Sequence, residues 1–243
     1  MTIFEKKSHG KLPIIDGKLS LSRAIYLIML PILITGLMLF FEYGVDFKEP
    51  VLHFITVTLL PLSLFILTIK WLLGSNLKDL FQGDFGANWK PWLLYFFGAV
   101  FYAIFMGQVV FSLLHLNVTA DASSSQDTSF LPYLIQTIND LFSLFNEELF
   151  AIPVFIGFAV IFYQHLNMKR NTSIYLALFL SMIIFGLAHF EAYSWNLPQM
   201  LLIMGALRFF VTGSFIRTRN ILIPYTIHFA FDTLFFTIAF LTN

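Results

Sequence analysis

The sequence predicts an all-α, polytopic helical membrane protein with about seven transmembrane helices. Of its 243 residues, 58% are hydrophobic and only 12% are charged, whereas a soluble domain carries roughly twice that charge. Apolar runs of about 20 residues, the length that crosses a bilayer, recur along the chain. We therefore expect one integral-membrane domain over residues 1–243, with a polar cavity formed by the C-terminal four helices.

The expected spans follow the apolar runs. They are Ser22–Phe41, Val51–Leu73, Trp92–Leu116, Leu144–Leu166, Ile174–Tyr193, Gln199–Ile216 and Ile221–Leu241. The amphipathic segment Leu131–Phe145 has three interpretations: an interfacial helix, a re-entrant helix, or a long extension of the fourth span.

The distribution of basic residues predicts the orientation in the membrane. Of the 14 Lys and Arg residues, all but Lys48 and Arg208 fall on one side of a seven-span arrangement. They are Lys6, Lys7, Lys11, Lys18, Arg23, Lys70, Lys78, Lys90, Lys169, Arg170, Arg217 and Arg219. The positive-inside rule then places the N-terminus in the cytoplasm, and the loop Asn117–Ser129, which has no basic residue, outside. The short loops favour a bacterial plasma membrane.

Composition also excludes several function classes. The formal net charge is zero, so nothing indicates a nucleic-acid partner. The chain contains no cysteine, which excludes disulfides, thiolate nucleophiles and cysteine metal sites.

An acidic pair, Glu147 and Glu148, interrupts the apolar stretch FNEELFAIPVF at Phe145–Phe155. A charged side chain at membrane depth costs several kcal/mol, so such residues mark functional sites by default. The question for the rest of the chain is which groups face these carboxylates.

Three further spans carry polar groups. His189 lies late in span five, Arg208 lies in the middle of span six, and His228 and Asp232 lie in span seven. The spacing of His228 and Asp232 puts both on one helix face, one turn apart. Each residue alone is compatible with a structural hydrogen bond between helices. Their concentration in the last hundred residues favours a shared cavity instead.

These residue types suit the hydrolysis of an amide. A glutamate can act as general base on water, and a nearby histidine can assist the proton transfer. A second histidine, oriented by a partner such as Asp232, can donate to a developing oxyanion. No Ser or Thr has an obvious nucleophile setting, which favours activated water over a covalent intermediate.

Three short motifs resemble the CAAX-protease and bacteriocin-processing (Abi) family of intramembrane endopeptidases. The family pattern is Glu-Glu-x-x-x-Arg, Phe-x-x-x-His and His-x-x-x-Asn or Asp; here these begin at Glu147, Phe185 and His228. The resemblance covers about Leu144–Leu234 and implies a protease core at about residues 131–243. It further implies that Glu147 activates a water molecule and that His189 assists this activation. By the same resemblance, His228 and Asp232 line the oxyanion site, and Glu148 has a supporting role in the site.

The chain departs from the pattern at one position, because Ile152 replaces the motif arginine. We hypothesise that Arg208, the only basic residue inside a span, supplies this charge, and that Arg208→Ala abolishes activity while the fold stays intact. We expect no metal and no other cofactor. Zinc is the alternative, ranked second because adjacent glutamates diverge by about 100° on a helix.

The depth of the residues presents a difficulty. With these boundaries Glu147 and His189 lie near the outer ends of their spans, whereas His228 lies about 10 Å from the inner end of its own. Straight helices do not bring the three together, so tilt, a broken span or different boundaries must close the gap.

Three functions remain in view. The first is an endopeptidase for a peptide or protein substrate, such as a bacteriocin or pheromone leader peptide or a CAAX-like protein. The second is a non-catalytic family member that confers bacteriocin immunity or regulates a membrane protein, which the missing arginine favours. The third, a transporter or proton relay, lacks any sign of an inverted repeat. The sequence does not specify the oligomeric state.

Overall fold

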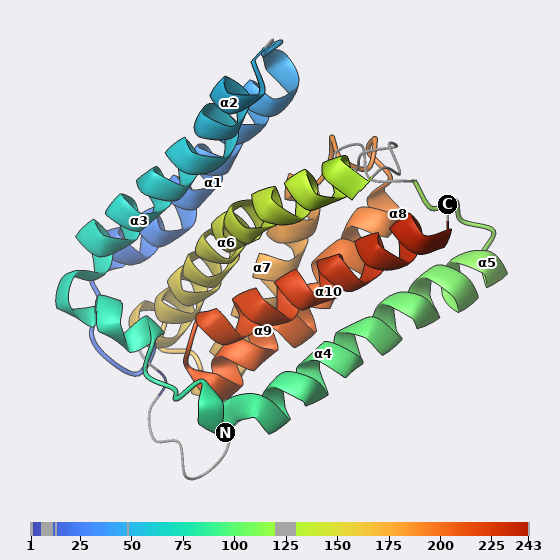
Figure 1. The fold of residues 1–243 in the computed structure, drawn as a ribbon. Helices are drawn as coiled ribbons and strands as arrows, with labels where there is room; N and C mark the ends of the chain where they lie inside the picture. Colours follow the sequence, from blue (N-terminus) through green and yellow to red (C-terminus); the bar gives the residue numbers. More distant parts are fainter. Residues whose placement is uncertain (1, 6–11, 13, 48, 120–129, 243) are drawn as a thin grey trace.

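The computed structural model describes residues 2–5, 12, 14–47, 49–119 and 130–242, and these form a bundle of long helices (Figure 1). Seven helical segments are long and apolar enough to cross a membrane, and no β-strand occurs in the described residues. The segments are Leu21–Gly44, Pro50–Leu80, Gly86–Leu113, Phe130–His165, Arg170–Ala188, Leu197–Thr218 and Leu222–Thr242. The all-α class and the seven predicted spans are confirmed.

Three spans are uninterrupted α-helices: α1 (Leu21–Gly44), α7 (Arg170–Ala188) and α10 (Leu222–Thr242). The second span consists of α2 (Pro50–His53), η2 (Phe54–Leu59), α3 (Leu60–Leu73) and η3 (Gly74–Leu80). The third consists of η4 (Gly86–Asn88), α4 (Trp89–Ile104), η5 (Phe105–Val110) and α5 (Phe111–Leu113). The sixth consists of α8 (Leu197–Gln199), η7 (Met200–Gly205) and α9 (Ala206–Thr218).

Local sequence explains several helix boundaries. The Ser20 side chain accepts a hydrogen bond from the backbone N–H of Arg23 and so caps the start of α1. Gly74 has a φ of 54°, a left-handed value that suits glycine, and it follows the last residue of α3. Pro50 begins α2, where its missing N–H leaves no bond unmade.

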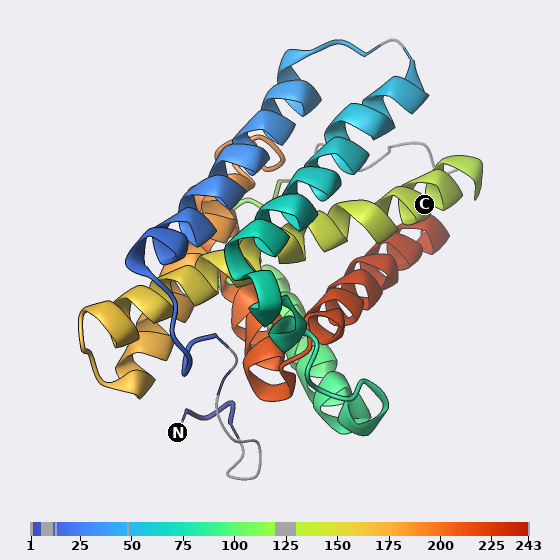
Figure 2. The ribbon, with the colours of Figure 1, turned by 90° about the vertical axis from the view of Figure 1, so that its left-hand side faces the viewer.

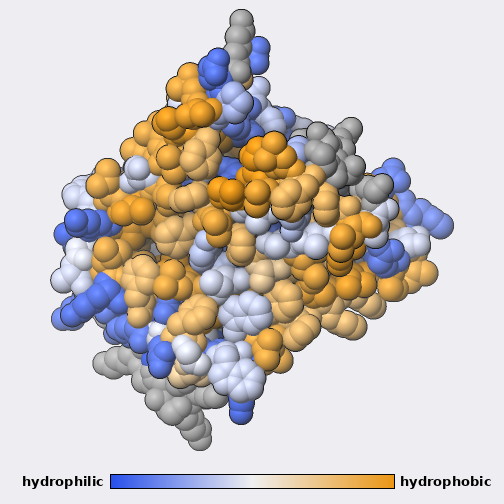
Figure 3. Space-filling view, in the orientation of Figure 1, coloured by the Kyte–Doolittle hydropathy of each residue, from blue (hydrophilic) through white to orange (hydrophobic). Residues whose placement is uncertain are grey.

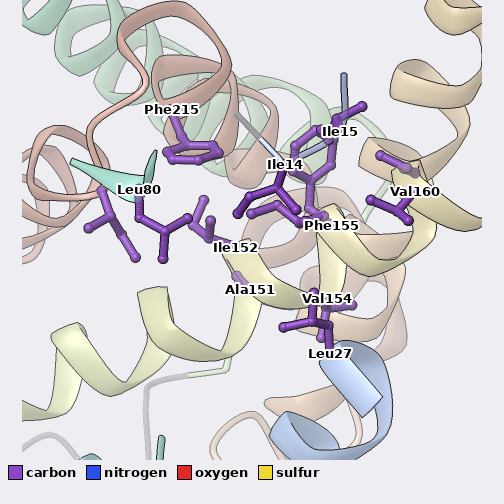
Figure 4. Packing of buried hydrophobic residues seen from close by; sticks show 14 of the residues in the cluster. Ile14, Ile15, Leu27, Leu80, Ala151, Ile152, Val154, Phe155, Val160 and Phe215 are labelled. Atoms are coloured by element: carbon purple, nitrogen blue, oxygen red, sulfur yellow. The ribbon is translucent and has the colours of Figure 1, made fainter. Parts of the chain in front are cut away.

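The fourth span lies at the centre of the bundle. It consists of α6 (Phe130–Val160) and a terminal π-helical turn, η6 (Ile161–His165). Helix α6 contacts α1, α3, α7 and α10, and Figure 2 shows it passing behind α1 and α3. A Cβ added at Gly157 would lie 2.6 Å from Ile28 Cγ1, so only glycine permits this approach of α6 to α1. The inner part of α6 is surrounded by apolar side chains, including Phe155 and Leu27 (Figure 4).

Two predicted boundaries are wrong in a way that matters for the site. The fourth span begins at Phe130 rather than Leu144, and of the three interpretations of Leu131–Phe145 the long extension of that span is confirmed. The fifth span ends at Ala188 rather than Tyr193. Turns follow α7, and Ser194 and Trp195 within them adopt positive φ angles. Hydropathy does not reveal either boundary, since both depend on local backbone geometry and packing.

The N-terminal segment folds back onto the bundle. Phe4, Ile14 and Ile15 are buried, and Arg170 at the start of α7 forms ion pairs with Glu5 at 2.7 Å and Asp16 at 2.6 Å. Four basic residues in the predicted charge count, Lys6, Lys7, Lys11 and Lys48, lie outside the described residues, as do residues 120–129 of the predicted external loop. The face in Figure 3 is largely hydrophobic, with hydrophilic residues gathered at its edges, as expected of a protein in a bilayer.

Candidate active site

Glu147 lies in the middle of the fourth span, 17 positions after Phe130 and 18 positions before His165. Its side chain keeps 29% of its surface exposed. Its Oε2 atom is nevertheless enclosed and accepts no hydrogen bond from the described residues. Glu147 Oε2 can therefore accept a hydrogen bond from a group other than the described side chains.

Two histidines face this oxygen. Nε2 of His189 lies 3.8 Å from Glu147 Oε2, and Nε2 of His228 lies 3.7 Å from the same atom. These separations exceed a direct hydrogen bond and suit a bridging water molecule. His189 follows α7 directly, and His228 lies in the second turn of α10, so α6, α7 and α10 all contribute to the site.

The Nδ1 atoms of His189 and His228 both have hydrogen-bond partners. Nδ1 of His189 lies 2.9 Å from the carbonyl oxygen of Phe185, which can only accept a hydrogen bond. Nδ1 therefore donates to that carbonyl, and Nε2 faces Glu147. Nδ1 of His228 lies 2.9 Å from Glu148 Oε1 and donates to that carboxylate.

Glu148 has a different environment from its neighbour. Its side chain is fully buried and receives hydrogen bonds from both terminal nitrogens of Arg208, at 2.5 and 2.7 Å. The guanidinium also donates from Nε to Thr212 Oγ1 at 3.2 Å and lies over the Phe185 ring, 4.7 Å from its centroid. Bidentate contact is the strong geometry for an arginine and a carboxylate. The predicted pairing of Arg208 with the first motif is thus present, and its partner is Glu148.

The structure also explains what occupies the position of the motif arginine. Ile152 is fully buried in the hydrophobic cluster that contains Leu80 and Phe215 (Figure 4). One turn separates it from Glu148 along α6. The counter-charge for Glu148 comes instead from α9, where Arg208 is 1% exposed.

Asp232 completes the group, with Oδ2 3.8 Å from His228 Nε2. All six residues selected from the sequence therefore form one connected cluster of side chains. The longer fourth span resolves the difficulty of depth, because it moves Glu147 from a span end to the centre of its helix. The expectation that Glu147 lies near an outer end was wrong for that reason.

Sequence reasoning missed two neighbours of the site. Thr212 accepts a hydrogen bond from Arg208, and Tyr193 stacks on the His189 ring at a centroid distance of 6.2 Å. It found Phe185 as a motif residue but not its contact with the Arg208 guanidinium. Thr212 and Tyr193 each follow a site residue by four positions, and this spacing was the available signal. It is weak, because many residues in helices have such neighbours.

A comparison with known families bears on this group of residues. Residues 141–234 match the family model described as type II CAAX prenyl endopeptidase Rce1-like. Over this segment the chain is similar to that family. The segment contains Glu147, Glu148, His189, Arg208, His228 and Asp232. The family so described consists of endopeptidases, which act on peptide or protein substrates. Neither a curated protein nor a solved structure matches the chain.

Proposed function

We propose that the protein hydrolyses a peptide bond within the membrane, with Glu147 as the general base that activates water. The observation that supports this best is the position of Glu147 Oε2 opposite Nε2 of both His189 and His228. A water molecule hydrogen-bonded there would have a proton acceptor on one side and imidazole groups on the other. Hydrolysis at membrane depth needs such a protected and oriented water.

In the proposed reaction Glu147 removes a proton from water, and the hydroxide attacks the carbonyl carbon of the scissile bond. His189, whose Nε2 faces the same water, orients it and assists the proton transfer. The negative charge that develops on the carbonyl oxygen is stabilised by the Nε2–H of His228 when that ring carries both protons. Glu147 then gives its proton to the departing amine nitrogen, and the C–N bond breaks.

Glu148 and Arg208 have positioning roles in this proposal. Glu148 accepts from Nδ1 of His228 at 2.9 Å, and the buried guanidinium holds that carboxylate in a fixed position. The pair therefore orients the imidazole that faces Glu147 and the substrate. Asp232 lies 3.8 Å from the same imidazole and would stabilise a positive charge on it.

We propose that the reaction uses no metal ion, with zinc as the alternative. Zinc sites place nitrogen and oxygen ligands about 2.0–2.2 Å from the metal. Among the described residues, no group of three or more His, Asp or Glu side chains is arranged to hold a metal ion.

The substrates that we propose are leader peptides of bacteriocins or of peptide pheromones, or CAAX-like proteins. The short loops favour a bacterial plasma membrane. The N-terminus would lie in the cytoplasm, because the described basic residues other than Arg208 lie in segments that meet at one end of the bundle. Arg170 contacts the N-terminal segment there, and the backbone of Arg219 accepts from Gln82 N–H.

The alternative function is a non-catalytic immunity or regulatory protein, which the replacement of the motif arginine by Ile152 favours.

One assay separates the two functions. Purified protein is incubated with candidate leader peptides beside the variants Glu147→Gln and His189→Ala, with and without a chelator. Cleavage that is lost in both variants and unaffected by the chelator supports the proposal. Immunity or regulation retained in both variants, without cleavage by the wild-type protein, supports the non-catalytic alternative. Loss of cleavage on chelation and its recovery with zinc would establish the metal mechanism.

A further inference from the structure

The residue before the acidic pair, Asn146, is a buried polar group that the proposed mechanism does not use. It is 2% exposed and lies in the middle of the fourth span. Its Nδ2 atom donates a hydrogen bond to the backbone carbonyl oxygen of Thr58 at 2.9 Å. Thr58 belongs to the second span, so this bond joins α6 to η2 directly beside the site.

The carbonyl of Thr58 lies in an irregular part of the second span. η2 is a π-helical turn, and the N–H of Leu60 bonds to the carbonyl oxygen of Ile55, five residues earlier. Pro61 follows at the start of α3 and has no N–H, so this turn lacks one regular helical hydrogen bond. Asn146 supplies a donor to the same turn from a neighbouring helix. π-Helical turns inside α-helices are frequent at functional sites.

Asn146 is not the residue that stability alone would favour at this position. Its Oδ1 atom is buried and accepts no hydrogen bond from the described residues. A leucine has a similar shape and would bury no unpaired oxygen, and apolar replacements of this kind are frequently neutral or stabilising. A buried asparagine can instead fix the register between helices at a cost in stability. The unpaired oxygen therefore favours a role for Asn146 in position.

Three consecutive residues of α6 face three different parts of the bundle. Asn146 bonds to η2, Glu147 faces the two histidines, and Glu148 pairs with Arg208 of α9. Successive positions on a helix are about 100° apart, so the side chains of Asn146 and Glu148 diverge by about 160°. The helix is thus bonded on two nearly opposite sides, and Glu147 lies between them. With one bond alone, this turn could pivot about the remaining contact.

We propose that Asn146 is a positioning residue. Its bond to the Thr58 carbonyl fixes the rotation of α6 at which Glu147 Oε2 lies opposite both imidazoles, at 3.8 and 3.7 Å. A misplacement of about 1 Å can lower the rate of a catalysed step by about 10²-fold. This consequence for the rate rests on the proposed hydrolytic function, whereas the placement of Glu147 does not.

The chain offers a matched pair of variants for the test. Asn146→Leu removes the donor beside Glu147 at similar volume. Asn139 lies two turns earlier on the same helix face, and its Oδ1 accepts a hydrogen bond from Thr58 Oγ1 at 3.0 Å. Asn139→Leu is therefore the same substitution, against the same residue of η2, at about 12 Å along the helix from Glu147.

The first measurement does not depend on catalysis. In protein labelled with ¹⁵N-histidine, the ring signals of His189 and His228 are assigned with His→Gln variants. We expect both to shift or broaden in Asn146→Leu and to stay in place in Asn139→Leu. His115 and His165, outside the site, serve as references that stay in place in both. Unmoved site signals in Asn146→Leu would overturn the proposal.

Thermal unfolding in detergent separates positioning from stability. We expect Asn146→Leu to unfold close to the wild-type temperature, because the substitution removes the unpaired Oδ1 together with the hydrogen bond. A variant that unfolds at a markedly lower temperature, or fails to fold, would assign Asn146 to stability and overturn the proposal.

Peptide cleavage then tests the consequence for the reaction. We expect kcat of Asn146→Leu to fall by about 10²-fold with KM nearly unchanged, and Asn139→Leu to keep both constants. An equal fall in both variants, or an unchanged kcat beside moved imidazole signals, would overturn the proposal. If the signals move and even the wild-type protein cleaves no peptide, the placement of Glu147 by Asn146 stands and the hydrolytic function does not.

Discussion

Glu147 and Glu148 carry the same carboxylate group on two sides of α6, and the two groups have different surroundings. Glu147 faces α7 and α10, is partly exposed, and has an Oε2 atom without a hydrogen bond from the described residues. Glu148 faces α9, is fully buried, and receives two hydrogen bonds from Arg208 and one from His228. A helix turns about 100° per residue, so adjacent positions meet different neighbours. One carboxylate is left available for a reaction, and the other is held in a structural ion pair.

The first prediction concerns the reactive side and has the largest expected effect. Glu147→Gln should lower the rate of peptide cleavage by about 10²–10⁴-fold, the range for a lost general acid–base group. The thermal midpoint should change little, because none of the described residues makes a hydrogen bond to Glu147 Oε2. Equal cleavage by the variant and the wild type would place the base elsewhere.

The second prediction concerns the buried side. Arg208→Ala leaves the Glu148 carboxylate buried and unpaired, which should destabilise the fold by about 3–5 kcal/mol. The hypothesis from the sequence that this variant keeps its fold intact is thus revised, because Arg208 proves to be fully buried. Thermal unfolding in detergent measures the change. A variant as stable as the wild type would show that the ion pair is not the buried contact described here.

The third prediction separates stability from positioning. The double variant Arg208→Met with Glu148→Gln removes both charges at similar volume and should recover most of the lost stability. It should not recover cleavage, because a neutral amide in place of the Glu148 carboxylate would orient His228 less firmly. Recovery of both properties would limit the pair to a structural role.

The fourth prediction uses a more exposed arginine cluster as a contrast. Arg170 is 24% exposed and forms ion pairs with Glu5 and Asp16 of the N-terminal segment, which lies outside the membrane spans. Burial alone would raise the pKa of Glu5, but hydrogen bonds from Arg170 and Thr2 outweigh it and lower the pKa to about 2. The stability that Glu5 contributes is therefore complete above about pH 4.5 and is lost as the pH falls through about 2.

The variant Glu5→Gln should accordingly be less stable than the wild type at about pH 6, and this difference should shrink between about pH 4.5 and 2. High salt should reduce the difference as well, since the cluster is partly exposed, while leaving the effect of Arg208→Ala unchanged. Thermal midpoints across pH and salt measure both. A difference that is constant with pH would assign the effect to packing rather than charge.

Much of this architecture could be predicted from the sequence, because bilayer-length apolar runs and rare charges inside them are strong signals. The pairing of Arg208 with the acidic motif followed from there being one basic residue inside a span. The extension of the fourth span back to Phe130 was one of three interpretations of an amphipathic segment, and hydropathy alone could not choose among them. The burial of Ile14 and Ile15 beneath η6 was also hidden, because a basic N-terminal tail gives no sign of tertiary packing.

The most direct test of the claim that Glu147 activates water is a single turnover in ¹⁸O-labelled water, with the protein in excess over a peptide that it cleaves. If Glu147 activates water, the label enters the new carboxylate of the peptide during the first turnover, and the protein stays unlabelled. Label found in the Glu147 side chain, with none in the first product, would show attack by the carboxylate itself and contradict the account.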